Sequence, residues 1–171
     1  MSSLRIDIVS DVVCPWCVIG VKRLEQALAS VDAELTVAVV WHPFELNPDM
    51  PAEGEDLIAY TSRKYDRTAE QSLETRTRLA ALAAEVDFPI NYDRRSRIYN
   101  TFKAHQLLAW ALREGRQAQL KFALFDAYFT RQENVDDPAV LLAAVERAGL
   151  DRAAAAAMLE EAGFADEVRA E

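Results

Sequence analysis

The sequence is poor in cysteine, in histidine and in long apolar runs. It has two cysteines and two histidines in 171 residues, whereas a structural zinc site needs four ligands at characteristic spacings. The histidines, His42 and His105, lie far apart and far from the cysteines. The longest apolar stretches, 35–41 and 153–159, fall well short of the roughly 20 residues that a membrane helix needs. We therefore expect no metal site and no membrane span.

Basic residues are also in deficit. Lysine and arginine number 19 against 28 acidic residues, which gives a net charge of −9 and a pI of about 4.8. Such a surface repels phosphate backbones and anionic lipids, so we expect neither nucleic-acid nor membrane partners. Arg94, Arg95 and Arg97 form a local basic cluster, which we interpret as the solvated start of a helix.

Nothing near the N-terminus has the pattern of a secretory signal. Arg5, Asp7 and Asp11 interrupt the apolar residues before the first cysteine, which predicts a cytoplasmic protein. In a reducing compartment, two cysteines separated by two residues are more typical of catalysis or metal binding than of a structural disulfide.

The first 47 residues have the pattern of a strand, a helix and a second strand. Residues 4–9 alternate and are β-branched, residues 15–29 have helical apolar spacing, and residues 35–41 are almost continuously apolar. Pro15 fits the first position of a helix, where its missing N–H costs nothing. This order predicts a parallel βαβ unit with a right-handed crossover.

The rest of the chain predicts helices. A proline-rich connection follows Trp41, and no convincing strand pattern occurs from Asp56 onward. We expect helices at 55–65, 69–87, 96–114, 117–131, 138–148 and 152–162. Two parallel strands are too few to stand alone. We therefore expect further strands after Glu171 or from another chain.

Cys14-Pro15-Trp16-Cys17 lies where the first strand meets the first helix. A free cysteine with a pKa near 8.5 is only about 3% ionised at pH 7, and the thiolate is the attacking species. A helix N-terminus favours a negative sulfur. We therefore predict that Cys14 attacks and that Cys17, one turn inside the helix and more buried, resolves the mixed disulfide. Pro15 is expected to stiffen the turn and Trp16 to shield one side.

Two further side chains near the motif each have two interpretations. Asp11 either relays protons to Cys17 or raises the pKa of Cys14, or it only makes a turn hydrogen bond. His42 follows the second strand and either favours the Cys14 thiolate or bonds to backbone. The aromatic residues Trp41, Phe44, Phe125, Tyr128 and Phe129 are expected to pack in the core or at a domain interface.

Four segments together resemble the DsbA-like thioredoxin family, and within it the FrnE-like oxidoreductases. They are 11–17 (DVVCPWC), 41–48 (WHPFELNP), 100–105 (NTFKAH) and 124–129 (LFDAYF). The resemblance implies an α/β, thioredoxin-like fold with a βαβ part at 1–47, a large helical insertion at 48–163 and a return to the first domain at 164–171. It implies no prosthetic group, and it places Asn100 and His105 on a helix along the cleft as possible substrate-binding residues.

The family pattern continues into further strands and a cis-proline, which the sequence does not contain after Pro138. The predicted function is dithiol–disulfide exchange with a protein or small-molecule thiol. The alternative is a glutathione-dependent isomerase or a kappa-class-like glutathione transferase, whose members resemble the chain but have serine at the position of Cys14. Glutathione is a possible thiol co-substrate, and a homodimer is possible.

Overall fold

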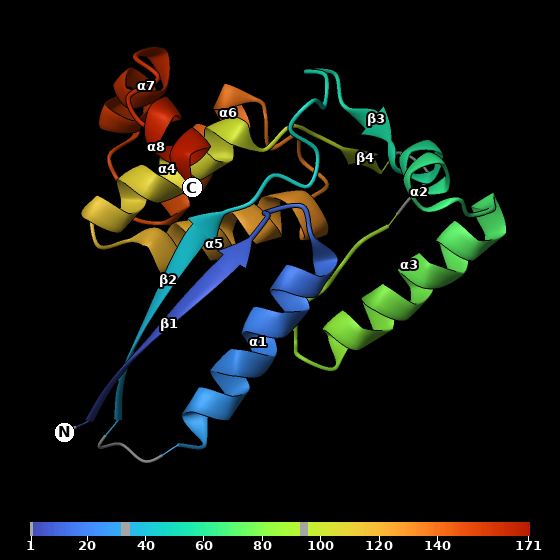
Figure 1. The fold of residues 1–171 in the computed structure, drawn as a ribbon, viewed down its shortest axis with the longest axis horizontal. Coiled ribbons are helices and arrows are strands. Elements are labelled where there is room, and N and C mark those ends of the chain that lie inside the picture. Colours follow the sequence, from blue (N-terminus) through green and yellow to red (C-terminus); the bar gives the residue numbers. More distant parts are fainter. Residues whose placement is uncertain (1, 32–34, 93–95) are drawn as a thin grey trace.

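The structure is a computed structural model and describes residues 2–31, 35–92 and 96–171. Arg94 and Arg95 of the basic cluster lie outside the described residues. Figure 1 shows the arrangement of the elements. The first half consists of β1 (Ser2–Ser10), α1 (Pro15–Ala29), β2 (Leu35–Pro43), β3 (Glu55–Asp56), α2 (Leu57–Tyr65) and α3 (Ala69–Ala84). The second half consists of β4 (Arg97–Ile98), α4 (Phe102–Arg113), α5 (Gln117–Phe125), the π-helical segment η1 (Asp126–Thr130), α6 (Pro138–Arg147), α7 (Arg152–Glu160) and α8 (Ala165–Ala170).

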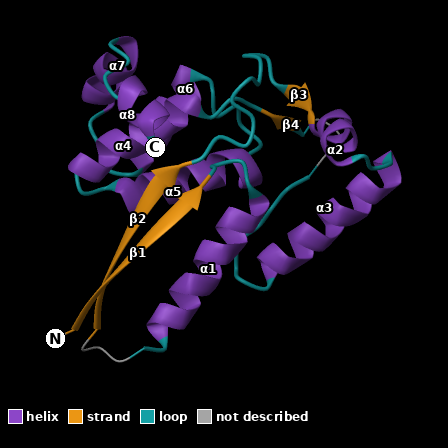
Figure 2. Ribbon diagram, in the orientation of Figure 1, coloured by secondary structure: helices purple, strands orange, loops and turns teal. Residues whose placement is uncertain are grey.

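The predicted βαβ unit is present. Strands β1 and β2 pair in parallel, with Ile8 opposite Trp41 and Val9 opposite His42. In the view of Figure 2 the strand pair lies between α1 and the group of helices that includes α4 and α5. Both α4 and α5 contact β2, while α1 contacts α3. The end of β1 and the start of α1 therefore lie between two groups of helices.

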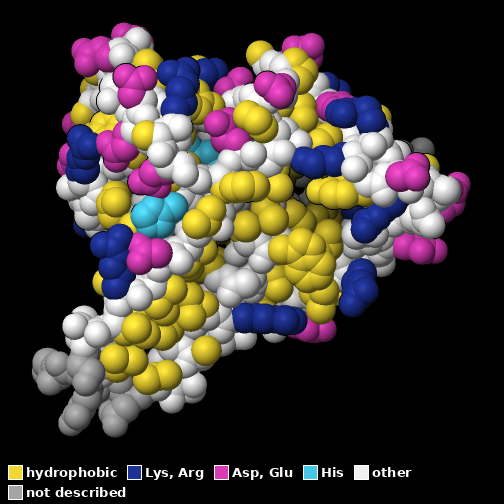
Figure 3. Space-filling view, viewed as in Figure 1, with side chains coloured by type: hydrophobic (Ala, Val, Ile, Leu, Met, Phe, Trp, Pro, Cys, Tyr) yellow, Lys and Arg dark blue, Asp and Glu magenta, His cyan; other side chains and the backbone are white. Residues whose placement is uncertain are grey.

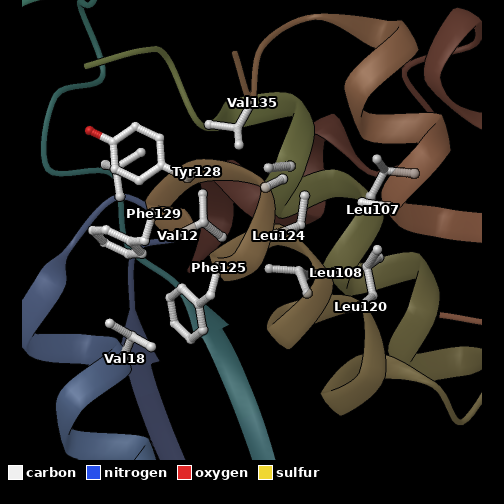
Figure 4. Packing of buried hydrophobic residues seen from close by; sticks show 14 of the residues in the cluster. Val12, Val18, Leu107, Leu108, Leu120, Leu124, Phe125, Tyr128, Phe129 and Val135 are labelled. Atoms are coloured by element: carbon white, nitrogen blue, oxygen red, sulfur yellow. The ribbon is translucent and has the colours of Figure 1, made fainter. Parts of the chain in front are cut away.

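The core lies mainly where α4, α5 and η1 meet the loop after β1. Figure 4 shows Val12 and Val18 from the N-terminal part beside side chains of the helical part. Of the aromatic residues predicted to be buried, Trp41, Phe125, Tyr128 and Phe129 are in the core, with exposed fractions of 8% or less. Phe44, which follows β2 directly, is 51% exposed and is therefore not a core residue.

Helix boundaries agree with the sequence at several caps. Asp151 caps α7 by accepting the N–H of Ala154 at 2.9 Å, as predicted. Gly115 and Gly149 follow α4 and α6 with φ of +66° and +74°, a left-handed conformation that glycine adopts without strain. None of the described helices is long and apolar enough to cross a membrane.

Two predictions about the elements after Asp56 are wrong. The first is that no strand occurs there: β3 and β4 form an antiparallel pair, with Glu55 opposite Ile98 and Asp56 opposite Arg97. Strands of two residues have no periodicity that a sequence pattern can detect. The helix expected at 96–114 begins at Phe102, because β4 and the turn after it occupy residues 97–101.

Candidate functional site

Cys14 and Cys17 lie at the start of α1, as predicted. Cys14 is the N-cap residue, Pro15 is the first helical residue, and the N–H of Cys17 donates to the carbonyl of Cys14 at 3.0 Å. Both thiols are free, and both residues are half-buried. Cys17 packs against the hydrophobic core, and the prediction that it is the more buried of the two stays a prediction.

A hydrogen bond between the two thiols couples their ionisation. The bond lowers the pKa of Cys17 to about 6 and raises that of Cys14, because Cys14 keeps its proton and donates it to the Cys17 sulfur. The N–H groups of Trp16 and Cys17 oppose the rise at Cys14, but the Cys14 side chain makes no capping hydrogen bond. The lowered pKa belongs to the pair, so its first ionisation is not assigned to one sulfur, whereas the sequence predicts the thiolate on Cys14. The two sulfurs share one proton and lose the first one as a unit.

Three buried ionisable side chains lie beneath this pair. Asp11 is 1% exposed, accepts the N–H of Leu46 at 2.7 Å and has its Oδ1 3.4 Å from Nε2 of His105. Burial raises the pKa of Asp11, but His105 and the Leu46 amide outweigh it and hold that pKa below its usual value. The charge of Lys121, which is 0% exposed, lowers the pKa of Cys17, and the charge of Asp11 raises it.

A cavity of about 410 Å³ opens beside Cys14. Its wall is formed by the start of α1, by α2 and α3, and by the end of η1. Cys14, Pro15 and Trp16 line it, whereas Cys17 is not among the described residues that do. Trp16 is 57% exposed and lies at the rim. Figure 3 shows hydrophobic side chains gathered on this face between the strands and α3, with lysines and arginines around them. Cys14 is thus the sulfur that a molecule in the cavity meets.

The other predicted site residues are not brought to Cys14. His42 lies on β2, and its ring nitrogens bond to Asp7 at 2.8 Å and to Glu171 at 2.7 Å, on the side of the sheet that α4 and α8 cover. These two carboxylates raise the pKa of His42. His105 is 2% exposed and packs behind Asp11. Neither histidine lines the cavity beside Cys14.

Asn100 is not on a helix, which corrects its predicted position. It precedes α4, and its Oδ1 accepts the N–H of Phe102 at 2.9 Å. Its Nδ2 donates to the carbonyls of Pro48 and Met50 at 3.2 and 3.4 Å. These contacts fasten the loop after β2 to the start of α4.

Sequence reasoning missed Lys121 and Arg76, although each breaks a local pattern. Lys121 is the one charged residue in the apolar helix Gln117–Phe125. Arg76 lies in the buried stripe of α3 that also contains Ser72, Leu79 and Ala83. A charged side chain in an otherwise apolar stripe is rarely buried without a functional or structural partner, and that is the signal that identifies both residues.

Comparison with known proteins is consistent with this geometry. Residues 5–171 match the DSBA-like thioredoxin domain family. The chain belongs to this family. The uncharacterized protein YwbO from Bacillus subtilis (strain 168) is 28% identical over 164 residues, which cover 96% of this chain and 76% of YwbO. A probable DsbA oxidoreductase from Streptomyces coelicolor is 34% identical, with a TM-score of 0.89 over 97% of this chain and 72% of that one.

A more distant structure has the same fold. It is the cytosolic disulfide reductase DsbM from Pseudomonas aeruginosa, with 19% identity and a TM-score of 0.59 over 97% of this chain and 77% of DsbM. These comparisons confirm the predicted thioredoxin-like fold of the DsbA type and the predicted enzyme class, a thiol–disulfide oxidoreductase.

Proposed function

We propose that the chain exchanges its Cys14–Cys17 dithiol with the disulfide of a substrate. The observation that carries this proposal is the pair of free, half-buried thiols at the start of α1, whose ionisation is coupled, with Cys14 lining a cavity. A thiolate is available near neutral pH because the pKa of Cys17 is lowered to about 6, and the sulfur that faces the substrate lies one hydrogen bond away.

The steps follow from this arrangement. As the Cys14 sulfur attacks a substrate disulfide, its proton moves along the hydrogen bond to Cys17, and one half of the substrate leaves as a thiolate. Cys17 then gives up the proton to the leaving half of the substrate as it attacks the sulfur of Cys14 in the mixed disulfide, and that half is released as a thiol. The protein is left with a Cys14–Cys17 disulfide, and two electrons have passed to the substrate. The same steps in reverse oxidise a dithiol.

Two serine variants and intact-mass measurement test this proposal. After reaction with an excess of insulin, Cys17→Ser is expected to carry a covalent adduct on Cys14, because the resolving sulfur is gone. Cys14→Ser is expected to carry none, and both variants are expected to lose insulin reduction with dithiothreitol as reductant. Turnover with glutathione that survives in Cys17→Ser would instead favour the isomerase or transferase alternative.

The domain boundaries, the cytoplasmic location and the homodimer stay predictions. The roles given to Pro15 and Trp16 also stay predictions. Glutathione stays a possible co-substrate.

A further inference from the structure

Two of the three guanidinium nitrogens of Arg76 are buried and unpaired in the part of the chain that the structure describes. Arg76 is 6% exposed, and its Nε and Nη2 have no hydrogen-bond partner among the described residues. Tyr92 lies against it, with 5.6 Å from Cζ to the ring centroid. A buried donor left unpaired is costly, and more so when it is charged. An arginine is always ionised in a protein, so this position calls for an anion.

The two unpaired nitrogens of Arg76, Nε and Nη2, are the same two atoms through which other arginines of this chain bind carboxylates. Nε and Nη2 of Arg5 donate to Asp7 at 3.0 and 2.7 Å. Nε and Nη2 of Arg63 donate to the two carboxylate oxygens of Glu55 at 3.3 and 2.6 Å. The planar fork of two N–H groups matches the two oxygens of a carboxylate.

The cavity beside Cys14 provides the space for such an anion, and Arg76 lines it. Although the chain has a net charge of −9, both charged side chains among the described lining residues, Arg67 and Arg76, are positive. Asp56 acts on Arg76 through its charge, but its Oδ1 already accepts the N–H groups of Ile58 and Ala59 at 2.9 Å.

The size and walls of the cavity indicate a small molecule. A volume of about 410 Å³ falls in the range of roughly 300–1,000 Å³ that is usual for small-molecule sites. Apart from the two arginines, the walls are mainly apolar or aromatic, and they include Tyr60, Tyr65 and Phe129. These walls suit a small molecule whose middle part is apolar or aromatic, with an anionic group at one end and a sulfur at the other.

We propose that the cavity binds a low-molecular-weight disulfide that carries a carboxylate, with Arg76 as the anion-binding residue. This inference rests on the proposed dithiol chemistry. Arg76 holds the carboxylate while Cys14 attacks the nearer sulfur and displaces one half as a thiolate. Cys17 then closes the protein disulfide and releases the second half, so that each substrate disulfide takes up two electrons from the protein dithiol.

Single-turnover reduction of two disulfides tests the inference. The fully reduced protein is mixed with dithiobis(nitrobenzoate), which carries carboxylates, or with uncharged dithiodipyridine, and the released thiol is followed by absorbance. Arg76→Met is compared with Arg78→Met, which removes the same charge from an exposed position of α3. Loss of a charge-assisted hydrogen-bonded pair is expected to slow Arg76→Met on dithiobis(nitrobenzoate) by about tenfold or more relative to Arg78→Met. The two variants are expected to agree on dithiodipyridine within about twofold.

Equal rates of the two variants on both disulfides would overturn the anion site and leave the dithiol function intact. If the wild-type protein reduces neither disulfide faster than a Cys14→Ser, Cys17→Ser double variant, the proposed dithiol function itself is contradicted.

If Arg76→Met does not fold, an inhibition experiment with the wild-type protein tests the anion site instead. Naphthoate is expected to slow dithiobis(nitrobenzoate) reduction, and uncharged naphthalenemethanol at the same concentration is expected to slow it much less. Equal inhibition by the two would contradict the proposal.

Discussion

Single buried side chains set the acidity of the cysteine pair. Lys121 is fully buried, and its Nζ has a long hydrogen bond of 3.4 Å to the carbonyl of Ser10. Burial lowers the pKa of Lys121 to about 8, against the opposing charges of Asp11 and the two cysteines. At pH 7 the lysine is therefore still mostly protonated and stabilises a thiolate above it.

Lys121→Met tests this charge. Without the cation, the apparent pKa of the first thiol ionisation is expected to rise by about one unit, because an opposite charge nearby shifts a pKa by one unit or more. The free energy of unfolding is expected to fall, since the buried carboxylate of Asp11 loses a neighbouring cation. Alkylation rates across pH and urea unfolding measure the two effects. Lys22→Met, which removes the same charge from α1, serves as the control, and an equal pKa change in both variants would contradict the prediction.

At the scale of elements, the sequence pattern predicted the features that depend on residues close together in the chain. The βαβ unit and the helix caps follow from apolar spacing and capping residues close in sequence. The pair β3–β4 and the late start of α4 depend on contacts between residues more than 40 positions apart, which no local pattern records. Asn100 was misplaced for this reason: its partners are the backbone of Phe102 and the loop at Pro48 and Met50.

Asn100→Ala distinguishes a structural role from substrate binding. Loss of the bond to the Phe102 N–H at the start of α4 and of the bonds to the loop is expected to lower the free energy of unfolding by about 1–2 kcal/mol. The rate of disulfide exchange at saturating substrate is expected to stay near that of the wild type. A variant with wild-type stability and a raised KM would instead place Asn100 in the substrate site.

Across the whole molecule, one side chain joins the sheet to the helical group. The Oε1 of Gln117 accepts the N–H of Trp41 at 3.0 Å, and its Nε2 donates to the carbonyl of Trp41 at 2.8 Å. The amide of Gln117 thus takes the place of a neighbouring strand beside β2.

The sequence predicted the fold and both cysteines. Lys121 and Arg76 each interrupt an apolar pattern in the sequence, but the groups that they face depend on how α5 and α3 pack around α1 and the loop before it.

Gln117→Ala leaves two buried backbone groups of Trp41 without partners. Each unpaired buried group costs about 1–3 kcal/mol, so a loss of about 2–6 kcal/mol in the free energy of unfolding is expected in urea titrations. Gln119→Ala, a change at an exposed position of the same helix, provides the comparison. Similar losses in the two variants would show that the link between β2 and α5 contributes little.

The shared proton of Cys14 and Cys17 is the central claim. The most direct test is the rate of iodoacetamide alkylation of the reduced protein across pH, with the modified cysteine identified by peptide mass spectrometry. Because the thiolate form increases as pH rises through the lowered pKa, the rate is expected to rise with a midpoint near 6, with the adduct mainly on Cys14. In Cys17→Ala, which lacks the partner sulfur, the midpoint is expected to move up toward about 8.5, the value of a free cysteine. A wild-type rate that rises only above about pH 8, as in the urea-unfolded chain, would contradict the account.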